Sequence, residues 1–374
     1  MPKRNVNIEL FRVIATLLVV MLHVLGQGGV LAGATPRGTN YWVAYFLEIG
    51  ALCAVNCFAL ISGYVMVGKT IKIRRIISLW LQVVFYSLLL TGLVFIFLPE
   101  SRSLKQLVFA VLPISGGQWW YISSYFALFF FIPFLNKAIE NISKQTFKKL
   151  LIVTFIGICC LNTVLETNPI GMNKGYSAAW LAVMYLFGAY VRKYNVEEKI
   201  TATKAVLGFF AMVTLTFLSK IGIHYLTVLI FGAAKRENVL ISYTSFTIFL
   251  AAVFLLLFCL KLKINRGAAK IISFLSPNAL GVYLIHVHPL VFEYVVKDLF
   301  RNFAQKTPPV MVLYSLAAVF AVFVVCVLIE WLRIQAFQWI KMDQFSEWLE
   351  KSIHRLYHKV FREEKTLSDN IDTV

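Results

Sequence analysis

Charged residues are scarce in this chain. Asp, Glu, Lys and Arg make up only 14% of its 374 residues, whereas hydrophobic residues make up 59%. A soluble domain of this length needs far less apolar surface than the mean hydropathy of +0.76 indicates. Several apolar runs also reach about 20 residues, the length of a membrane-spanning helix. The composition therefore excludes a soluble protein and predicts an all-α, polytopic membrane helix bundle.

Acidic residues are especially few, at 18 against 36 Lys and Arg, and the formal net charge is +18. In nucleic-acid-binding proteins the basic residues gather on one face or along one helix. Here they recur in short clusters between apolar runs, which is the pattern of membrane topology, so we expect membrane lipids and no nucleic acid as partners. Metal-ligand spacings are missing too. The six cysteines lie inside apolar segments, as small buried side chains do, and we expect no metal site.

The apolar runs predict about ten spans. The segment 202–240 is too long for a single span, and Lys220 and His224 interrupt it, so an interfacial or re-entrant piece is expected near 221–232. Of the 36 Lys and Arg residues, 26 fall on the side of the two termini. Because cytoplasmic loops carry the excess of Lys and Arg, both termini are predicted to be cytoplasmic. The predicted spans are 8–29, 41–67, 76–98, 118–136, 148–165, 176–192, 202–220, 241–260, 277–297 and 309–331.

Two regions are expected along the chain: a transmembrane domain at 1–332 and a cytoplasmic amphipathic tail at 333–374. From about 337 to 361, apolar side chains recur at helical spacing while basic side chains occupy other faces. This pattern predicts a helix that lies on the inner leaflet or packs on the cytoplasmic face of the bundle, and the sequence leaves both open. The apolar residues are Phe345, Trp348, Leu349, Ile353, Leu356, Tyr357 and Val360.

The first apolar run, residues 8–24, carries three ionisable side chains, Glu9, Arg12 and His23. Arg12 and His23 are eleven residues apart, so they share one stripe of a helix and are separated by ~16 Å along its axis. A charged group facing lipid costs roughly 2.5–3.5 kcal/mol or more, so such residues face a bundle interior or a water-filled cavity. Spacing alone leaves two interpretations open: a functional cavity, or Arg12 reaching the cytoplasmic interface while His23 makes an interhelical hydrogen bond.

Five stretches, taken together and in order, resemble one family. They are NIELFRVIATLLVVMLH (7–23), AVNCFALISGYV (54–65), WWYISSYFALFFFIPFLNK (119–137), SPNALGVYLIHVHPLV (276–291) and LIEWLR (328–333). The chain resembles acyltransferase family 3, the integral-membrane acyltransferases, and looks most like the branch that O-acetylates bacterial surface and capsular polysaccharides. The resemblance implies an enzyme of the bacterial cytoplasmic membrane. It also implies an acyl-CoA donor, acetyl-CoA first among them, and an acceptor hydroxyl on a polysaccharide or its lipid-linked precursor.

By this resemblance, Arg12 and His23 match the family's first-helix Arg and His, and Asn56 matches an Asx-containing motif of the second span. We expect His23 to act as general base toward the acceptor hydroxyl, because histidine changes charge near ambient pH. Arg12 or Asn56 is expected to stabilise the oxyanion. Glu48 lies at about the depth of His23 in an antiparallel hairpin. It either orients and polarises His23 or reaches outward to the interface.

The basic cluster after the second span matches the family's basic pair at Lys72 and Arg75, with Arg74 as the alternative to Lys72. The phosphates of coenzyme A need such cations at the cytoplasmic entrance, and Arg offers planar, bidentate contacts. Without the resemblance, the cluster would be assigned to membrane topology alone.

Six further residues are candidates for contacts with the acceptor. The histidine of the family's YLxH motif matches the first of two neighbouring histidines, with the second as alternative, and a late glutamate matches one in the last span. Three aromatic residues at the outer start of the fourth span belong to the interfacial belt or stack on sugar rings. In that order, the candidates are His286, His288, Glu330, Trp119, Trp120 and Tyr121.

A transporter or flippase of a glycan intermediate is the rival class, because it too would line a cavity with cations and aromatic rings. The stripe formed by Arg12 and His23 beside a cytoplasmic basic cluster favours the enzyme, since a flippase needs no acyl-CoA site. No internal repeat is visible, which weakens an inverted-repeat transporter. A homo-oligomeric assembly is left open by the sequence.

The charge asymmetry yields a direct test of topology. Single cysteines at Lys72 and Lys263 should be shielded from an impermeant thiol reagent in intact cells, because both positions are predicted to be cytoplasmic. Cysteines at Arg37 and Lys306 should react. Labelling in the reverse pattern at either pair would contradict the ten-span topology.

Overall fold

The computed structural model describes residues 5–355 except 167, 169 and 170, and every regular element within them is helical. Eight helical segments of this part are long and apolar enough to cross a membrane. Two shorter helices, α10 (Ala178–Tyr194) and α12 (Phe246–Lys261), coincide with the two remaining predicted spans. The eight are Val6–Gly33, Thr39–Met66, Ile73–Phe97, Trp120–Asn141, Lys144–Leu165, Ala202–Phe231, Arg266–His286 and Pro308–Trp339.

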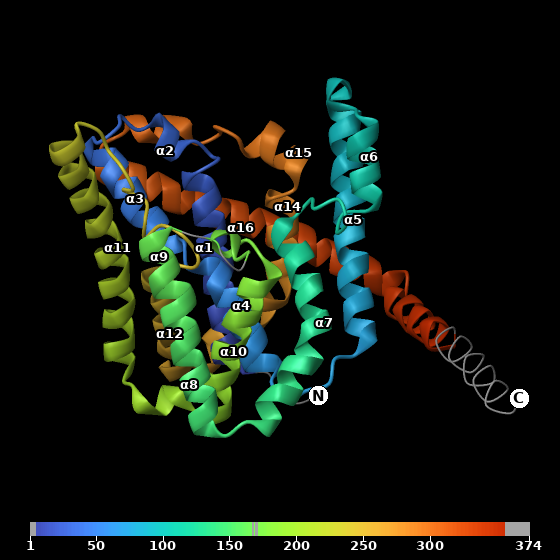
Figure 1. Cartoon of the computed structure of the whole chain (residues 1–374). Coiled ribbons are helices and arrows are strands. Elements are labelled where there is room, and N and C mark those ends of the chain that lie inside the picture. The colour runs from blue at the N-terminus through green and yellow to red at the C-terminus, as the bar shows by residue number, and fades with distance from the viewer. Residues whose placement is uncertain (1–4, 167, 169–170, 356–374) are drawn as a thin grey trace, which may run out of the picture.

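The helices form a bundle, and the predicted all-α polytopic membrane architecture is confirmed (Figure 1). The end of the bundle where α1 begins also holds the loops at 67–72, 195–201 and 262–265, and it is called the basic end below. Some spans consist of two helices, and short helices lie at the opposite end. The elements are α1 (Val6–Leu25), α2 (Val30–Gly33), α3 (Thr39–Ala51), α4 (Ala54–Met66), α5 (Ile73–Phe97), α6 (Leu104–Val111), α7 (Trp120–Asn141), α8 (Lys144–Thr154), α9 (Asn162–Leu165), α11 (Ala202–Phe231), α13 (Arg266–Leu275), α14 (Ala279–His286), α15 (Pro289–Val291) and α16 (Pro308–Trp339).

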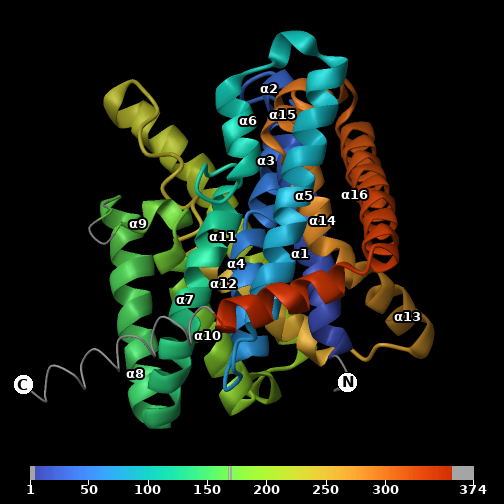
Figure 2. The ribbon, with the colours of Figure 1, turned by 90° about the vertical axis from the view of Figure 1, so that its right-hand side faces the viewer.

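Helix α1 lies in the middle of the bundle and packs against α3, α4, α12, α14 and α16 (Figure 2). It begins at a side-chain cap, because the Asn5 carboxamide oxygen accepts hydrogen bonds from the backbone N–H groups of Asn7 (3.0 Å) and Ile8 (3.4 Å). Phe11 and Val20 are fully buried. A helix that is apolar almost all round belongs to the core of a bundle, so polar side chains on α1 face protein or a cavity rather than lipid.

Two glycines allow α4 and α10 to approach closely. A Cβ atom at Gly63 would lie 1.9 Å from the Tyr185 carbonyl oxygen, and one at Gly188 would lie 2.1 Å from that of Leu60. Small residues let the backbones of membrane helices come into contact, where packing replaces the hydrophobic effect as the source of association. Gly63 of the ISGY stretch therefore serves helix packing.

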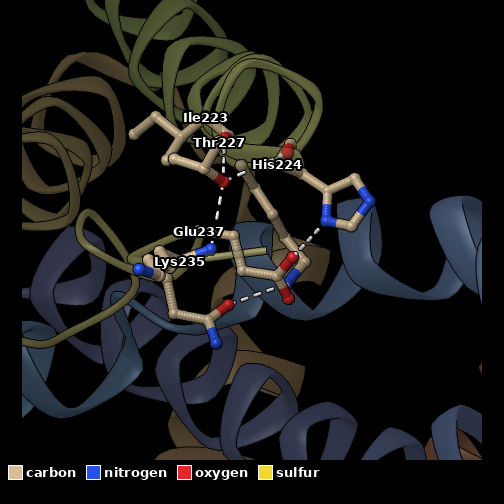
Figure 3. A network of polar contacts seen from close by, with 7 residues as sticks. Ile223, His224, Thr227, Lys235 and Glu237 are labelled. Carbon is tan, nitrogen blue, oxygen red and sulfur yellow. Dashed lines mark hydrogen bonds and ion pairs between the residues drawn. The ribbon is translucent and has the colours of Figure 1, made fainter. Parts of the chain in front are cut away.

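The prediction of an interfacial or re-entrant piece near 221–232 is wrong, because α11 continues unbroken to Phe231. Lys220 and His224 are buried within it, at 1% and 3% exposure. The Lys220 ammonium lies 3.3 Å from Glu237 Oε1 and donates to Asn238 Oδ1 at 2.7 Å, while His224 Nδ1 lies 2.5 Å from Glu237 Oε2 (Figure 3). The loop after α11 folds back and supplies the countercharge, so the helix has no reason to break.

Helix α16 runs past the predicted end of the last span at 331 and past the expected domain boundary, and it ends at Trp339. Residues 342–355 then form a helix that lies across the basic end of the bundle (Figure 2). Ser346 is buried on its inner side, whereas Phe345, Trp348 and Ile353 are 44–55% exposed. The tail helix thus packs on the bundle and turns an apolar face outward. The expected members Leu356, Tyr357 and Val360 lie outside the described residues.

The Glu237 contacts predict a loss of stability in a Glu237→Gln variant. Burial raises the pKa of Glu237, but the hydrogen bond from His224 and the charge of Lys220 outweigh it and lower that pKa below its usual value. Removing the carboxylate leaves the buried Lys220 ammonium without the carboxylate that it contacts, which costs roughly 3 kcal/mol. We expect a lower melting temperature for the purified protein at neutral pH, measured by intrinsic fluorescence.

The sign of the pH dependence follows from the lowered pKa. The stabilisation is fully present above the unfolded-state pKa of glutamate and is lost as the pH falls through the lower folded-state value. The two proteins should therefore converge as the buffer is acidified. Glu293→Gln is the matched control, because its ion pair with Lys297 is more than half exposed on both sides and should contribute little. Equal melting temperatures for Glu237→Gln and wild type would contradict this account.

Candidate active site

A cavity of about 340 Å³ lies between α1, α4, α5, α7 and α14. It reaches from Arg75, in the first turn of α5 at the basic end, to Trp120, at the start of α7. The cavity therefore spans much of the bundle, and most of its wall is apolar. The polar or aromatic side chains that line it include Arg12, His23, Ser62, Arg75, Trp120, Tyr121, Tyr125, Tyr243 and Tyr283.

Two histidines meet at this cavity. His23 Nδ1 lies 3.0 Å from His286 Nε2, and His286 Nδ1 lies 2.5 Å from the carbonyl oxygen of Val282. A carbonyl oxygen can only accept, so His286 Nδ1 carries a hydrogen and its Nε2 is the acceptor in the neutral ring. His23 Nδ1–H then donates to His286, which leaves a lone pair on His23 Nε2. His23 lines the cavity, whereas His286 is buried behind it at 3% exposure.

The two cations of the cavity lie toward the basic end. Arg12 donates from Nη1 to Ser276 Oγ at 3.0 Å, which ties α1 to the segment before α14. Arg12 and His23 both line the cavity, so the shared stripe corresponds to a real surface, but ~16 Å along the helix axis separates them. Arg75 is the member of the predicted basic cluster that also lines this cavity. The cations and the histidine pair thus occupy different depths of one cavity.

Arg74 points to the tail helix instead. Its guanidinium lies 3.8 Å from both Asp343 and Glu347, and Glu350 accepts a hydrogen bond from the Arg74 backbone N–H at 3.1 Å. Lys72, the N-cap of α5, makes no side-chain capping bond, so Glu350 provides a carboxylate at this helix N-terminus from another element. The predicted basic cluster therefore divides: Arg75 belongs to the cavity, and Arg74 anchors the tail.

The aromatic triplet divides as well. Trp120 and Tyr121 line the cavity, and Trp120 lies against Tyr243 with ring centroids 6.1 Å apart and planes inclined by 19°. Trp119 is buried at 1% exposure and packs edge-on against His288 at 5.5 Å. His288 is itself fully buried with Nε2 3.3 Å from Thr91 Oγ1. Of the two histidines, His286 is thus the one that reaches His23.

Asn56 and Glu330 have structural partners away from the cavity. The carboxamide of Asn56 accepts from Trp180 Nε1 and donates to the Tyr243 carbonyl, both at 2.8 Å, so it holds the loop that carries Tyr243. The Glu330 carboxylate accepts from Tyr86 (2.6 Å), Gln82 (3.0 Å) and Arg333 (2.7 and 2.9 Å). Those bonds join α5 to α16 and satisfy a buried charge.

The structure does not bring Glu48 to His23. Within the described part of the chain no hydrogen bond joins them, since His23 Nδ1 is used by His286 and Glu48 lies within electrostatic range of Lys220 on α11. Equal depth in a hairpin does not fix how each helix is rotated about its axis. Here the rotation of α3 turns Glu48 toward α11.

A family model described as an acyltransferase domain matches residues 5–331. The chain belongs to the acyltransferase 3 family. It is a multi-pass membrane acyltransferase, and the membership decides against the transporter alternative. No curated protein and no solved structure matches the chain.

Three cavity residues of the acyltransferase were given no functional role from the sequence. Tyr283 precedes His286 by one helical turn, and its enclosed hydroxyl has no side-chain hydrogen-bond partner among the described residues. Ser62 lies in the ISGY stretch and donates to the Phe58 carbonyl at 3.0 Å. Tyr283 and Ser62 lie in the stretches that carry the family resemblance, and this position was the signal that could have identified them. Tyr243 comes from the loop between α11 and α12, and nothing in its local sequence marks it.

The division of the basic cluster predicts that Arg74, and not Arg75, holds the tail helix. In a Ser346→Cys background, Arg74→Glu should speed thiol labelling at 346 in the purified acyltransferase, because it repels three nearby carboxylates and frees a side chain that is 1% exposed. Arg75→Glu is the matched control and should leave labelling slow. Equal labelling rates in the two variants would show that Arg74 does not anchor the tail.

Proposed function

We propose that this acyltransferase moves an acyl group, acetyl in the first instance, from acyl-CoA to a hydroxyl of a cell-surface polysaccharide or its lipid-linked precursor, in the bacterial cytoplasmic membrane. One observation carries the proposal: a single cavity joins two arginines toward the basic end to a histidine with a free nitrogen lone pair deeper in the bundle. Such a cavity suits a long, thin donor with anionic and reactive ends.

The donor would enter from the basic end, where Arg12 and Arg75 offer cations to its diphosphate. Beyond them the cavity wall includes Val19, Leu22 and Leu280, an apolar surface suited to a thin pantetheine arm and to the exclusion of water. The thioester would then lie near His23. The proposed direction agrees with the predicted cytoplasmic location of the basic end.

The proposed chemistry begins at His23 Nε2. That nitrogen takes the proton of the acceptor hydroxyl as the oxygen attacks the thioester carbonyl carbon, and a C–O bond forms. When the tetrahedral intermediate collapses, the C–S bond breaks and the leaving thiolate takes the proton back from His23. His286 acts as a positioning residue, because its Nε2 accepts from His23 Nδ1 throughout and its own Nδ1 is fixed by the Val282 carbonyl.

The oxyanion is assigned to Tyr283 rather than to Arg12 or Asn56. Arg12 is ~16 Å along the helix from His23, and the Asn56 carboxamide is engaged by Trp180 and Tyr243. Tyr283 lines the same cavity as His23, and its buried hydroxyl has no side-chain hydrogen-bond partner among the described residues. A buried donor without a partner is costly in the resting protein, and a developing negative charge would satisfy it.

The acceptor would lie against the wall of the cavity that Trp120, Tyr121 and Tyr243 form. Rings of this kind offer a flat apolar face together with a polar edge, which is the combination a sugar ring needs.

Two measurements test the substrates. Purified protein should release free thiol from acetyl-CoA in the presence of acceptor glycan. Surface glycan from wild-type cells should carry O-ester signals in NMR spectra that mild base removes, and glycan from a deletion strain should lack them. Absence of both signals would refute the proposed donor and acceptor.

His23→Ala should lower the rate of acyl transfer by ~10²–10⁴-fold with normal insertion, because it removes the general base. Tyr283→Phe should lower kcat by ~10²–10³-fold, as expected for one lost oxyanion donor. His286→Gln should shift the pH–rate profile, since it changes the group that orients His23. The exposed His354 provides the control, and His354→Ala should keep full activity. Wild-type rates in His23→Ala at matched expression would exclude the mechanism.

A further inference from the structure

A second cavity, of about 520 Å³, lies at the basic end between the ends of α4, α7 and α10. Lys69, Arg192 and Lys193 line it, and Glu140 is the one acidic side chain among its lining residues. We call this cavity the vestibule. Its excess of positive charge marks it as a place for an anion rather than for a lipid chain.

The cations of the vestibule are held in place. The Arg192 guanidinium lies over the ring of Tyr64 at 5.3 Å from the centroid, and Nη1 is 3.5 Å from the Tyr64 hydroxyl. Lys193 donates to the carbonyl of Ile139 at 2.5 Å. Stacking on an aromatic face orients the planar guanidinium and leaves its remaining donors available, which is the geometry used to bind phosphate.

Asn136 fixes the loop that carries the third cation. Its Nδ2 donates to the backbone carbonyls of Met66 (3.0 Å) and Lys69 (3.1 Å), and its Oδ1 accepts from the Tyr185 hydroxyl at 2.7 Å. Gly68 lies between those two carbonyls with φ of +67°, a conformation that side chains rarely adopt. The loop is therefore built around a buried carboxamide, and Lys69 lies at the edge of the vestibule.

The vestibule and the candidate active-site cavity share two wall helices, α4 and α7. On α4, Ile61 lines the catalytic cavity and Val65, four residues later, lines the vestibule. On α7, Phe129 and Asn136 do the same with a spacing of seven. Spacings of four and seven keep side chains on one face of a helix, and seven residues advance by ~10 Å. The two cavities therefore lie one after the other along the same helix faces, as an elongated ligand would require.

We infer that the vestibule binds the ribose 3′-phosphate of the coenzyme A donor, through Lys69 and Arg192. This inference rests on the proposed function, in which Arg12 and Arg75 take the diphosphate. The 3′-phosphate is a separate anionic group at the far end of the donor. The vestibule holds three cations in addition to the two arginines of the candidate active-site cavity, and these match that second charge.

The test compares acetyl-CoA with acetyl-dephospho-CoA, which lacks only the 3′-phosphate. Wild type should show a KM about tenfold lower for acetyl-CoA, the effect of one charge-assisted phosphate contact. Lys69→Ala and Arg192→Ala, made separately, should each raise the KM for acetyl-CoA and leave that for acetyl-dephospho-CoA unchanged, with similar kcat. Arg192→Lys should retain part of the preference. Lys148, an exposed lysine on α8 outside both cavities, supplies the control, and Lys148→Ala should behave as wild type.

Failure of this inference is distinguishable from failure of the proposed function. If wild type transfers acetyl from both donors with equal KM, or if Lys69→Ala and Arg192→Ala keep the full preference, the vestibule does not bind the 3′-phosphate while the acyltransferase reaction stands. If neither donor supports transfer by wild type, the acyl-CoA donor itself is wrong. Arg75→Ala separates the sites further, because it should raise KM for both donors alike.

Discussion

The fold of this acyltransferase depends on one constraint: an ionisable side chain inside an apolar bundle must find a partner on another helix. A charge left in hydrocarbon costs roughly 2.5–3.5 kcal/mol or more, whereas a hydrogen-bonded pair inside the bundle avoids most of this cost. Glu330 meets Tyr86, Gln82 and Arg333, and Lys220 meets Glu237. Each such contact joins segments distant in sequence or holds a loop against a helix. The hydrogen bonds of the buried polar groups therefore form only when the helices take this arrangement.

The proposed active site is the place where this pairing is left incomplete. His286 satisfies one nitrogen of His23, and the lone pair of the other remains, while the enclosed hydroxyl of Tyr283 has no side-chain partner among the described residues. Two unsatisfied groups in one cavity are expensive in a resting protein and useful in a transition state, which forms new charge at that point. Helices α1 and α14, packed against each other, set the distance between them.

Much of the architecture was predictable, because membrane spans are set by local composition. Most of the ten apolar runs, the family-bearing stretches and the tail helix over 342–355 appear where hydropathy and helical spacing indicated, but the ninth span is Arg266–His286 rather than the predicted 277–297. The error at 221–232 has a single cause. Lys220 and His224 look like an interruption in the sequence, but Glu237 and Asn238 lie 13 to 18 residues further along and neutralise them. Hydropathy along the sequence does not take into account a loop residue that folds back and pairs with a charge on the helix.

The sequence by itself determined that this is a membrane helix bundle with acyltransferase motifs, and it placed Arg12 and His23 on one stripe, since a helix fixes the spacing of its own side chains. Only the tertiary structure decided which partner each side chain meets. It paired His23 with His286 rather than Glu48, sent Arg75 to the cavity and Arg74 to the tail, and engaged Asn56 with Trp180. The reason is geometric: hydropathy fixes where helices begin and end, whereas the rotation of each helix about its axis depends on packing against all its neighbours.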